Sequence, residues 1–212
     1  SVYPKDKQTS FYLRGVGLEA KKHLREYKIS SRLVMSKQEN LSSVIVQKNK
    51  LVGDSGWEIV LLKLDNYFVG RTIGVQPFES LGKRDYGRPD RDDFSGMIPP
   101  KLAQAMINLA VQSEDSHIMD PFCGSGTIVQ EALLMGYQKI SGFDYSERAI
   151  KDSKENILWL SDEFGCDISG VNFQKVDVRE LDGNIKNVDA IITEPYLGPP
   201  ARHGSCLLYT SD

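Results

Sequence analysis

Four short apolar segments in the second half of the chain each end in an acidic residue. Asp120, Asp144 and Asp177 end the first three segments, and Glu194 ends the fourth. If these segments are parallel strands, their carboxyl ends lie along one edge of a sheet, where open α/β sheets bind ligands. The serial order of the acids therefore predicts one ligand site at that edge.

A glycine-rich loop follows the first acid, in the stretch DPFCGSGT. Gly124 and Gly126 let the backbone turn tightly and approach a ligand closely. NAD enzymes and methyltransferases both carry such a loop, but Val129 stands where the dinucleotide fingerprint has its third glycine. Asp120 suits a ligand that bears a cation rather than a pyrophosphate. S-adenosylmethionine (SAM), with an ammonium, a sulfonium and no phosphate, therefore fits better than NAD.

The next two acids fit the rest of an adenosine ligand. Asp144 stands 18 residues beyond Gly126, at a position from which a carboxylate can accept both ribose hydroxyls, a feature that NAD enzymes share. Asp177 is either an acceptor for the adenine amine or a solvated loop acid. The two residues support an adenosine ligand without choosing between cofactors.

The fourth segment leads into a turn suited to holding a base. Methylating an exocyclic amine requires an acceptor for the amine hydrogens, so that the lone pair points at the methyl group, and a flat apolar surface for the base. Glu194 and the turn Pro195-Tyr196 can supply both. The alternative is an ordinary surface turn after a buried strand.

The elements that must position these residues alternate regularly after Ser95. Short apolar strands between helices predict a parallel sheet covered on both faces, in a doubly wound α/β domain. The expected strands are 117–122, 139–145, 172–178 and 188–194, and the expected helices are 99–110, 127–137 and 146–164. The first helix is expected to bury Leu102, Met106, Leu109 and Ala110. The last is expected to start at an N-cap Ser146 and to bury Ile150, Ser153, Ile157, Leu160 and Phe164.

The first part of the chain has a mixed α+β pattern. A helix is expected over 15–28, followed by β-like segments at 31–36, 42–47, 57–64 and 66–75. Residues 78–94 combine turn formers with charges of both signs and are expected to form a linker.

Charge is distributed unevenly along the chain. Residues 1–94 hold 17 Lys and Arg against 12 Asp and Glu, whereas residues 95–212 hold 9 against 17. This fits a module that grips a polyanion joined to a catalytic one, or two solvated surfaces that differ. No apolar stretch reaches the ~18 residues of a membrane helix. Cys123, Cys166 and Cys206 are too widely spaced for a disulfide framework or a zinc pattern, which favours reduced thiols in the cytoplasm.

The motifs DPFCGSGT, FDYS, VDV and TEPYLG occur in this order, and with them the chain resembles the THUMP-containing class I methyltransferases of the tRNA guanine-N2 (guanosine-10) type. The stretches RDYGRP and SGMIPPKLAQAMINLA are also similar to that family, and the resemblance covers residues 11–204. It implies a partial THUMP-like RNA-binding domain over 1–77 and a Rossmann-like methyltransferase domain over 95–204. It also implies SAM as cofactor without a metal, tRNA or another structured RNA as partner and no membrane. Whether a small activator subunit is a further partner stays open.

The resemblance also implies roles for individual residues. The cofactor-binding residues would be Asp120, Phe122, Gly124, Ser125, Gly126, Thr127, Asp144, Tyr145, Asp177 and Val178. The residues that hold the target base would be Glu194, Pro195 and Tyr196. The family usually has Asp-Pro-Pro-Tyr at this last motif, and aligning on Pro-Tyr instead makes Thr193 its first residue. Glutamate is one methylene longer than aspartate, so its reach toward the target atom differs.

The sequence is expected to be incomplete. The four strands expected after Ser95 are fewer than a class I methyltransferase sheet holds, and CLLYTSD resembles a translated sequencing-library adapter. Residues 205–212 are therefore expected to be a non-native scar. The 212-residue chain as written is expected to fold poorly and to show little activity.

The expected function is SAM-dependent N-methylation of a nucleic-acid base, with guanine N2 in tRNA as the first choice. One alternative is a DNA adenine or cytosine N-methylase, because the same motif serves that chemistry. Another is a non-catalytic RNA-binding module that retains the fold. A third uses Cys123 as a nucleophile, as in 5-methylpyrimidine formation, but no base is positioned beside it in the sequence.

Overall fold

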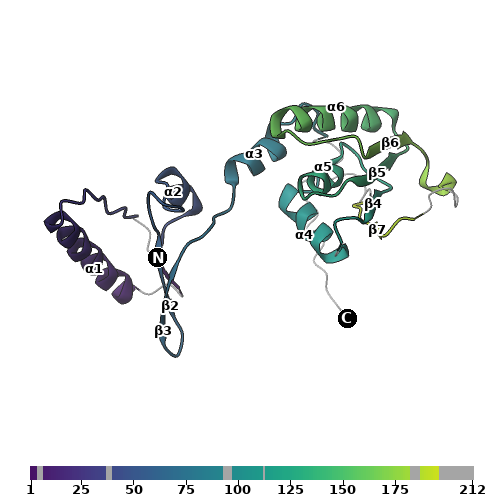
Figure 1. Cartoon of the computed structure of the whole chain (residues 1–212). Helices are drawn as coiled ribbons and strands as arrows, with labels where there is room; N and C mark the ends of the chain where they lie inside the picture. Colours follow the sequence, from purple (N-terminus) through teal and green to yellow (C-terminus); the bar gives the residue numbers. More distant parts are fainter. Residues whose placement is uncertain (4–6, 37–39, 93–96, 112, 182–186, 196–212) are drawn as a thin grey trace, which may run out of the picture. The chain divides into compact units, whose positions relative to one another are not determined.

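The computed structural model describes residues 1–3, 7–36, 40–92, 97–111, 113–181 and 187–195. The chain divides into two compact units, Ser1–Phe78 and Glu79–Asp212, whose elements are labelled in Figure 1. None of the helices that the structure describes is long and apolar enough to span a membrane.

The first unit contains a small mixed sheet and two helices. Its strands are β1 (Val2–Tyr3), β2 (Ile59–Lys63) and β3 (Tyr67–Arg71), and its helices are α1 (Lys7–Glu26) and α2 (Ser43–Lys48). β2 lies in the middle, parallel to β1 and antiparallel to β3. The unit is therefore α+β, and α1 begins earlier than the expected helix.

Two of the expected β-like segments of this unit are not strands. Residues 31–36 form no strand, and residues 43–48 form α2. The Ser42 hydroxyl accepts a hydrogen bond from the Ile45 N–H at 3.4 Å and thereby caps the helix. Val46 is buried on one side of this helix. A run of β-branched residues, which usually favours a strand, is therefore compatible with a short helix of six residues.

The second unit is built on a parallel sheet with the strand order β6-β5-β4-β7. Its strands are β4 (His117–Asp120), β5 (Lys139–Asp144), β6 (Val171–Lys175) and β7 (Ala190–Ile191). All four expected strands are present and parallel. The chain steps from β4 to β5 to β6 in one direction and then returns to place β7 on the other side of β4.

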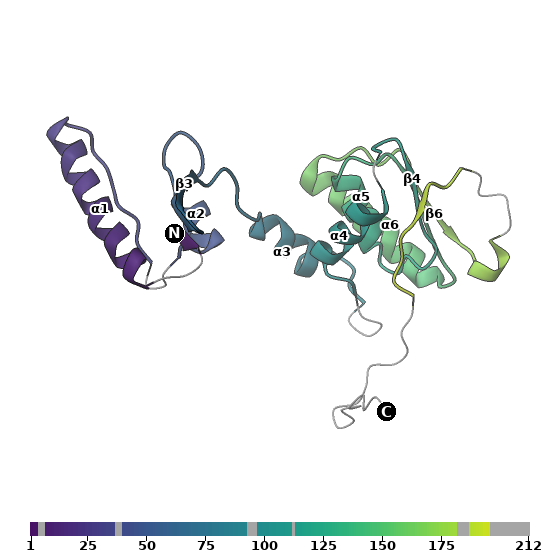
Figure 2. The ribbon, with the colours of Figure 1, turned by 90° about the horizontal axis from the view of Figure 1, so that it is seen from below.

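Three helices of this unit cover one face of the sheet. They are α4 (Pro100–Ala110), α5 (Thr127–Leu134) and α6 (Glu147–Phe164). The crossovers through α5 and α6 step the same way across the sheet, and right-handed crossovers therefore place both helices on the same face, as Figure 2 shows together with α4. The expectation of helices on both faces is thus not met within the described residues.

The phase of α6 agrees with the sequence, whereas that of α4 does not. Ser146 caps α6, and Ile150, Ser153, Ile157 and Leu160 are buried as expected. In α4, Leu102 and Leu109 are 51% and 86% exposed, and Ala103 and Ile107 are buried instead. Apolar residues lie all around α4, and the small Ala103 allows close contact with a neighbouring helix, so packing rather than hydrophobicity sets which side faces inward.

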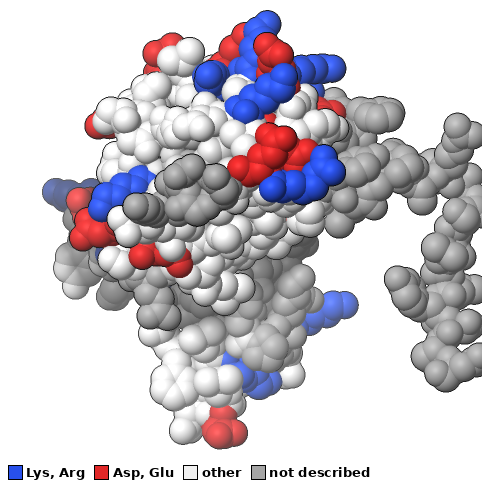
Figure 3. Space-filling view, turned by 90° about the vertical axis from the view of Figure 1, so that its right-hand side faces the viewer, with Lys and Arg blue, Asp and Glu red and all other residues white. Residues whose placement is uncertain are grey.

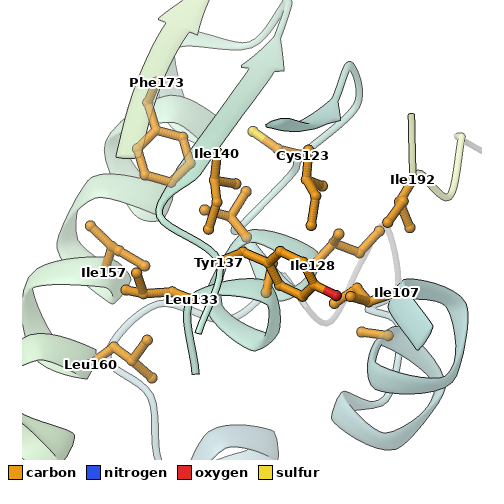
Figure 4. Close-up of a cluster of buried hydrophobic side chains, with 14 of the residues drawn as sticks. Ile107, Cys123, Ile128, Leu133, Tyr137, Ile140, Ile157, Leu160, Phe173 and Ile192 are labelled. Atoms are coloured by element: carbon orange, nitrogen blue, oxygen red, sulfur yellow. The ribbon is translucent and has the colours of Figure 1, made fainter. Parts of the chain in front are cut away.

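The core of the second unit lies between these helices and the sheet (Figure 4). Ile107, Ile128, Leu133, Ile140, Ile157, Leu160, Phe173 and Ile192 are all buried in one cluster. Burying each such side chain contributes ~1.5–3 kcal/mol. The cluster joins residues from β4, β5 and β6 with Ile192 directly after β7, and Ala190 of β7 packs against it. It therefore fixes the strands relative to one another.

The segment expected to be a linker is part of the second unit. It begins with helix α3 (Phe78–Tyr86), and the side chain of Arg84 is buried against α5, where its Nε and Nη2 donate to the Glu131 carboxylate at 2.6 and 3.2 Å. Gln104 donates to the same carboxylate at 2.7 Å. Charged residues normally indicate a solvated segment, and the partner that allows Arg84 to be buried lies 47 residues away.

Candidate functional site

The candidate site lies where the chain reverses direction across the sheet, between β4 and β7. Ligands of open α/β sheets bind outside the carboxyl ends of the strands at such a switch point. Asp120 ends β4, Asp144 ends β5, and Thr193 and Glu194 follow β7. The fourth predicted acid, Asp177, follows β6 by two residues, so all four acids stand at the carboxyl ends of these parallel strands.

Asp120 is the most deeply buried of these acids, with 2% of its surface exposed. Its Oδ1 accepts hydrogen bonds from the Thr193 hydroxyl at 2.7 Å and from the Phe122 N–H at 3.1 Å. Burial raises the pKa of Asp120 to about 7; the two hydrogen bonds oppose this shift, and the charges of Asp144 and Glu194 add to it. Among the described residues, none of these three acids forms an ion pair.

The glycine loop has the conformation that its sequence predicts. Gly124 and Gly126 have φ angles of 53° and 87°, in the left-handed region that other residues avoid. A Cβ at Gly124 would meet no described atom within 4 Å, whereas one at Gly126 would contact Ser153 at 3.4 Å. Gly126 also stands at the N-cap of α5. The first glycine therefore borders open space, and the second allows close packing.

Asp144 connects the end of β5 to the glycine loop. Its Oδ2 accepts a hydrogen bond from the Gly124 N–H at 3.0 Å, and its Oδ1 accepts one from the Ser146 N–H at 2.9 Å. Asp144 is 9% exposed, and its neighbour Tyr145 is 75% exposed. Each carboxylate oxygen keeps a lone pair after these bonds and can accept a hydroxyl hydrogen.

The remaining predicted residues of the loop differ in exposure. Phe122 is exposed, whereas Ser125 and Thr127 are buried. The Thr127 hydroxyl accepts a hydrogen bond from Arg88 Nη1 at 2.7 Å, and the Ser125 hydroxyl lies 3.6 Å from the Met97 sulfur. The side chains of Ser125 and Thr127 thus contact the protein itself.

Asp177 makes local contacts. It caps the short 3-10 helix η1 (Val178–Glu180), accepting a hydrogen bond from the Arg179 N–H at 2.9 Å, and it pairs with the Arg179 guanidinium. Hydrogen bonds from the Arg179 side chain and backbone lower the pKa of Asp177 to about 2. Val178 is exposed. The structure does not bring Asp177 into contact with the other acids, and its adenine-binding role stays a prediction.

The turn after β7 is only partly described. Glu194 and Pro195 are exposed, and Tyr196 lies outside the described residues. Thr193, which the sequence suggested only through an alternative alignment of the motif, donates its hydroxyl hydrogen to Asp120. A threonine that follows a short apolar segment gives no sign of such a partner, since Asp120 stands 73 residues earlier.

Cys123 does not have the environment of a nucleophile. The residue is 5% exposed, and burial, together with the charge of Asp120, raises the pKa of its thiol to about 12. The thiolate is the nucleophilic form of cysteine and is scarce at neutral pH under these conditions. The structure therefore disfavours catalysis through a bond to Cys123.

The geometry of the second unit agrees with a comparison against protein families. The model of the UPF0020 family, described as an RMKL-like methyltransferase domain, matches residues 88–201, which is more than half of the chain. The chain belongs to this family. Its second unit is accordingly a methyltransferase domain, and the expected Rossmann-like α/β fold with a parallel sheet is confirmed. The match begins at Arg88, within the segment that the sequence suggested to be a linker.

Individual relatives match parts of the chain. It is 33% identical over 146 residues to a tRNA (guanine(10)-N2)-dimethyltransferase of Methanothermobacter thermautotrophicus, covering 67% of this chain and 40% of that protein. It is 31% identical over 125 residues to a tRNA (guanine(6)-N2)-methyltransferase of Thermus thermophilus, covering 58% and 35%. The crystal structure of TrmN from Thermus thermophilus has a TM-score of 0.45 and 21% identity, covering 84% and 45%. The chain spans about 40% of the length of the first of these curated relatives.

Proposed function

We propose that the protein transfers a methyl group from SAM to the exocyclic amine of a nucleic-acid base, and that this base is a guanine of tRNA, methylated at N2. The observation that carries the proposal is the group of carboxylates Asp120, Asp144 and Glu194 at the switch point of a methyltransferase sheet, none of which forms an ion pair among the residues that the structure describes. The names of the relatives support tRNA guanine as the substrate.

The residues present fit SAM as the cofactor. Asp120 is a buried acid without a cationic partner among the described residues, and a bound ammonium would supply that partner. The open side of Gly124 allows a ligand to approach the backbone. Asp144 keeps acceptor capacity for the two ribose hydroxyls. We therefore assign Asp120 to the methionine end of the cofactor and Asp144 to its ribose.

The proposed reaction needs orientation more than acid–base strength. SAM supplies an electrophilic methyl group on a positively charged sulfur. Glu194 would accept a hydrogen bond from the attacking amine, which aims the nitrogen lone pair at the methyl carbon and stabilises the positive charge that develops on the nitrogen. Asp120, buried next to Thr193, holds the cofactor end of this arrangement. Pro195 and Tyr196 would hold the base.

The first unit would bind the RNA, in the cytoplasm where tRNA is modified. Residues 1–78 carry 13 Lys and Arg against 7 Asp and Glu, whereas residues 79–212 carry 13 against 22. On the face drawn in Figure 3, described side chains of both signs are interspersed, so they form no single-sign patch there. The net positive charge that a polyanion requires is thus concentrated in the first unit. We propose that this unit is the THUMP-like domain.

The decisive experiment uses the complete gene product that contains these residues. Transfer of a radiolabelled methyl group from SAM would be measured with bulk tRNA and with duplex DNA, followed by nucleoside analysis of the labelled RNA. We expect label in tRNA as N2-methylguanosine or N2,N2-dimethylguanosine. Label in DNA alone would replace the substrate that we propose, and SAM binding without transfer to either would favour a non-catalytic RNA-binding protein.

A further inference from the structure

We propose that Asn156 is a positioning residue for the glycine loop of the cofactor site. Asn156 lies on the core face of α6 and is fully buried. Its Nδ2 donates to the carbonyl oxygens of Ser125 and Asp90, both at 2.9 Å, and its Oδ1 accepts a hydrogen bond from the Asp90 N–H at 3.0 Å. One side-chain amide therefore ties α6 both to the glycine loop and to the segment after α3.

The neighbouring residues strengthen this connection. Ser153, one turn earlier on α6, donates its hydroxyl hydrogen to the Gly124 carbonyl at 2.6 Å. Arg88, two residues before Asp90, donates to the Thr127 hydroxyl. The glycine loop is thus held from the helix on one side and from the segment after α3 on the other.

Holding these carbonyls fixes the shape of the loop. A peptide group is planar, so fixing the carbonyls of Gly124 and Ser125 fixes the peptide planes on both sides of Ser125. These planes connect the two glycines that have left-handed backbone angles. The Gly124 N–H, on the other side of the same glycine, donates one of the two hydrogen bonds that orient the Asp144 carboxylate; the Ser146 N–H donates the other. Asn156 therefore acts on the proposed ribose-binding residue through the loop.

A simple packing role does not account for an asparagine at this position. An amide buried among aliphatic side chains is costly unless its hydrogen-bonding groups are paired. An aliphatic residue would fill the same space on the apolar face of α6 without that requirement. Asn156 uses both amide hydrogens and its oxygen on backbone groups of two other segments, which is the pattern of a positioning residue.

The test compares Asn156→Ala and Asn156→Asp with Ile157→Val in the complete gene product. Asn156→Asp keeps the volume and the acceptor but loses the donors to both carbonyls. Ile157→Val is the matched control, because it removes one methylene from the buried neighbour and leaves the loop contacts intact. The ligand probe is S-adenosylhomocysteine, measured by calorimetry well below the melting temperature of each variant. The ligand-free probe is hydrogen exchange of the amides of Cys123, Gly124 and Gly126, all of which donate hydrogen bonds.

We expect both Asn156 variants to bind S-adenosylhomocysteine about ten-fold more weakly, since each loses hydrogen bonds to buried carbonyls. Their loop amides should exchange faster without ligand. Ile157→Val should change neither the affinity for S-adenosylhomocysteine nor the exchange of the loop amides, even where it lowers the melting temperature by as much as the Asn156 variants do. Unchanged affinity and exchange in the Asn156 variants, or equal changes in Ile157→Val, would overturn the positioning role. The ligand in this test rests on the proposed function. If the wild type failed to bind S-adenosylhomocysteine, the proposed cofactor would be wrong, while loop exchange would still decide the role of Asn156.

Discussion

At the scale of single residues, Asp120 combines two opposing demands. The residue is buried among the charges of Asp144 and Glu194, which favours its neutral form, while the proposed ligand requires its charged form. The hydrogen bond from Thr193 partly offsets the cost of the charge. Once Asp120 is ionised, its buried carboxylate is unfavourable without a cation beside it. A bound cation relieves this cost, and the relief strengthens binding.

This arrangement predicts that affinity and stability change in opposite directions with pH. The pKa of Asp120 is about 7 in the folded protein, compared with 3.8 for an unperturbed aspartate, as in the unfolded chain. Without ligand, the folded state therefore binds more protons than the unfolded state between these values, and the free energy of unfolding should fall as pH rises through that range and level off above about 7. S-adenosylhomocysteine should bind about eight-fold more tightly at pH 7.5 than at pH 6, as the carboxylate becomes ionised.

The variant Asp120→Asn serves as the control for this pH dependence. It should bind S-adenosylhomocysteine about ten-fold more weakly than the wild type at pH 7.5, lose most of the pH dependence of binding, and be more stable than the wild type without ligand at that pH. Calorimetry and urea unfolding at the two pH values measure these quantities. A wild-type affinity that is independent of pH would remove Asp120 from the ammonium site.

Glu194 is expected to affect transfer and not cofactor binding. It is exposed and follows β7, and no described residue pairs with it. Glu194→Ala should lower kcat for tRNA by about 100-fold, the loss typical of one preorganised group that stabilises developing charge, and should change the affinity for S-adenosylhomocysteine less than about two-fold. Glu194→Gln keeps an acceptor oxygen and should retain part of the activity. The exposed Glu155→Gln on α6 is the control; unchanged kcat in Glu194→Ala would exclude this role.

The residues of the site could be predicted from the sequence where the signal is local. Asp120 and Asp144 end strands, Gly124 and Gly126 turn tightly, and the structure places all four together at the strand ends. The sequence named Thr193 only through an alternative alignment, without its contact to Asp120, and Asn156 and Arg88 were missed, because the partners of the three residues stand 73, 31 and 39 residues away. A buried polar contact between distant segments leaves no periodic pattern in the sequence.

At the scale of secondary structure elements, the sequence predicts existence better than orientation. All four strands of the second unit and the phase of α6 are correct, because hydrophobic periodicity and capping residues agree there. The expected phase of α4 is wrong, and residues 78–86 of the expected linker form the helix α3. In both places the outcome depends on a neighbour, α5, which contacts α4 and buries Arg84.

The buried ion pair between α3 and α5 gives a prediction at this scale. Arg84→Met would leave Glu131, whose side chain is 1% exposed, without its guanidinium partner. Removing one member of a buried pair typically costs ~3–5 kcal/mol, so urea unfolding of the second unit should show a loss of that size. Replacing both residues, in Arg84→Met with Glu131→Leu, should recover most of the loss.

The adjacent residue supplies a matched control for that experiment. Lys83, on the same helix α3 as Arg84, pairs with Glu163 of α6, but the side chain of Lys83 is 57% exposed. Exposed ion pairs contribute ~0–1 kcal/mol, so Lys83→Met should change the free energy of unfolding by less than that. Equal losses for Lys83→Met and Arg84→Met would show that the helix, and not the buried pair, responds to substitution.

At the scale of the whole molecule, the two units differ in charge as well as in fold. Residues 1–78 carry an excess of six positive charges, and residues 79–212 carry an excess of nine negative charges. An RNA approaching the carboxylates of the second unit meets electrostatic repulsion, which a basic unit in the same chain can offset. The proposed function therefore assigns cofactor binding and RNA binding to different units.

This division predicts separable losses. The triple variant Lys21→Ala, Lys22→Ala and Arg25→Ala removes three cations from α1 in the complete gene product, and the control Lys151→Ala with Lys154→Ala removes two exposed cations from α6. The α1 variant should bind tRNA more weakly, with a shallower dependence of affinity on salt, because each lost phosphate contact lowers the slope of log K against log salt by about one. Both variants should bind S-adenosylhomocysteine as the wild type does. Filter binding over a series of salt concentrations measures the slope, and an unchanged slope in the α1 variant together with a reduced one in the α6 control would place the RNA on the second unit instead.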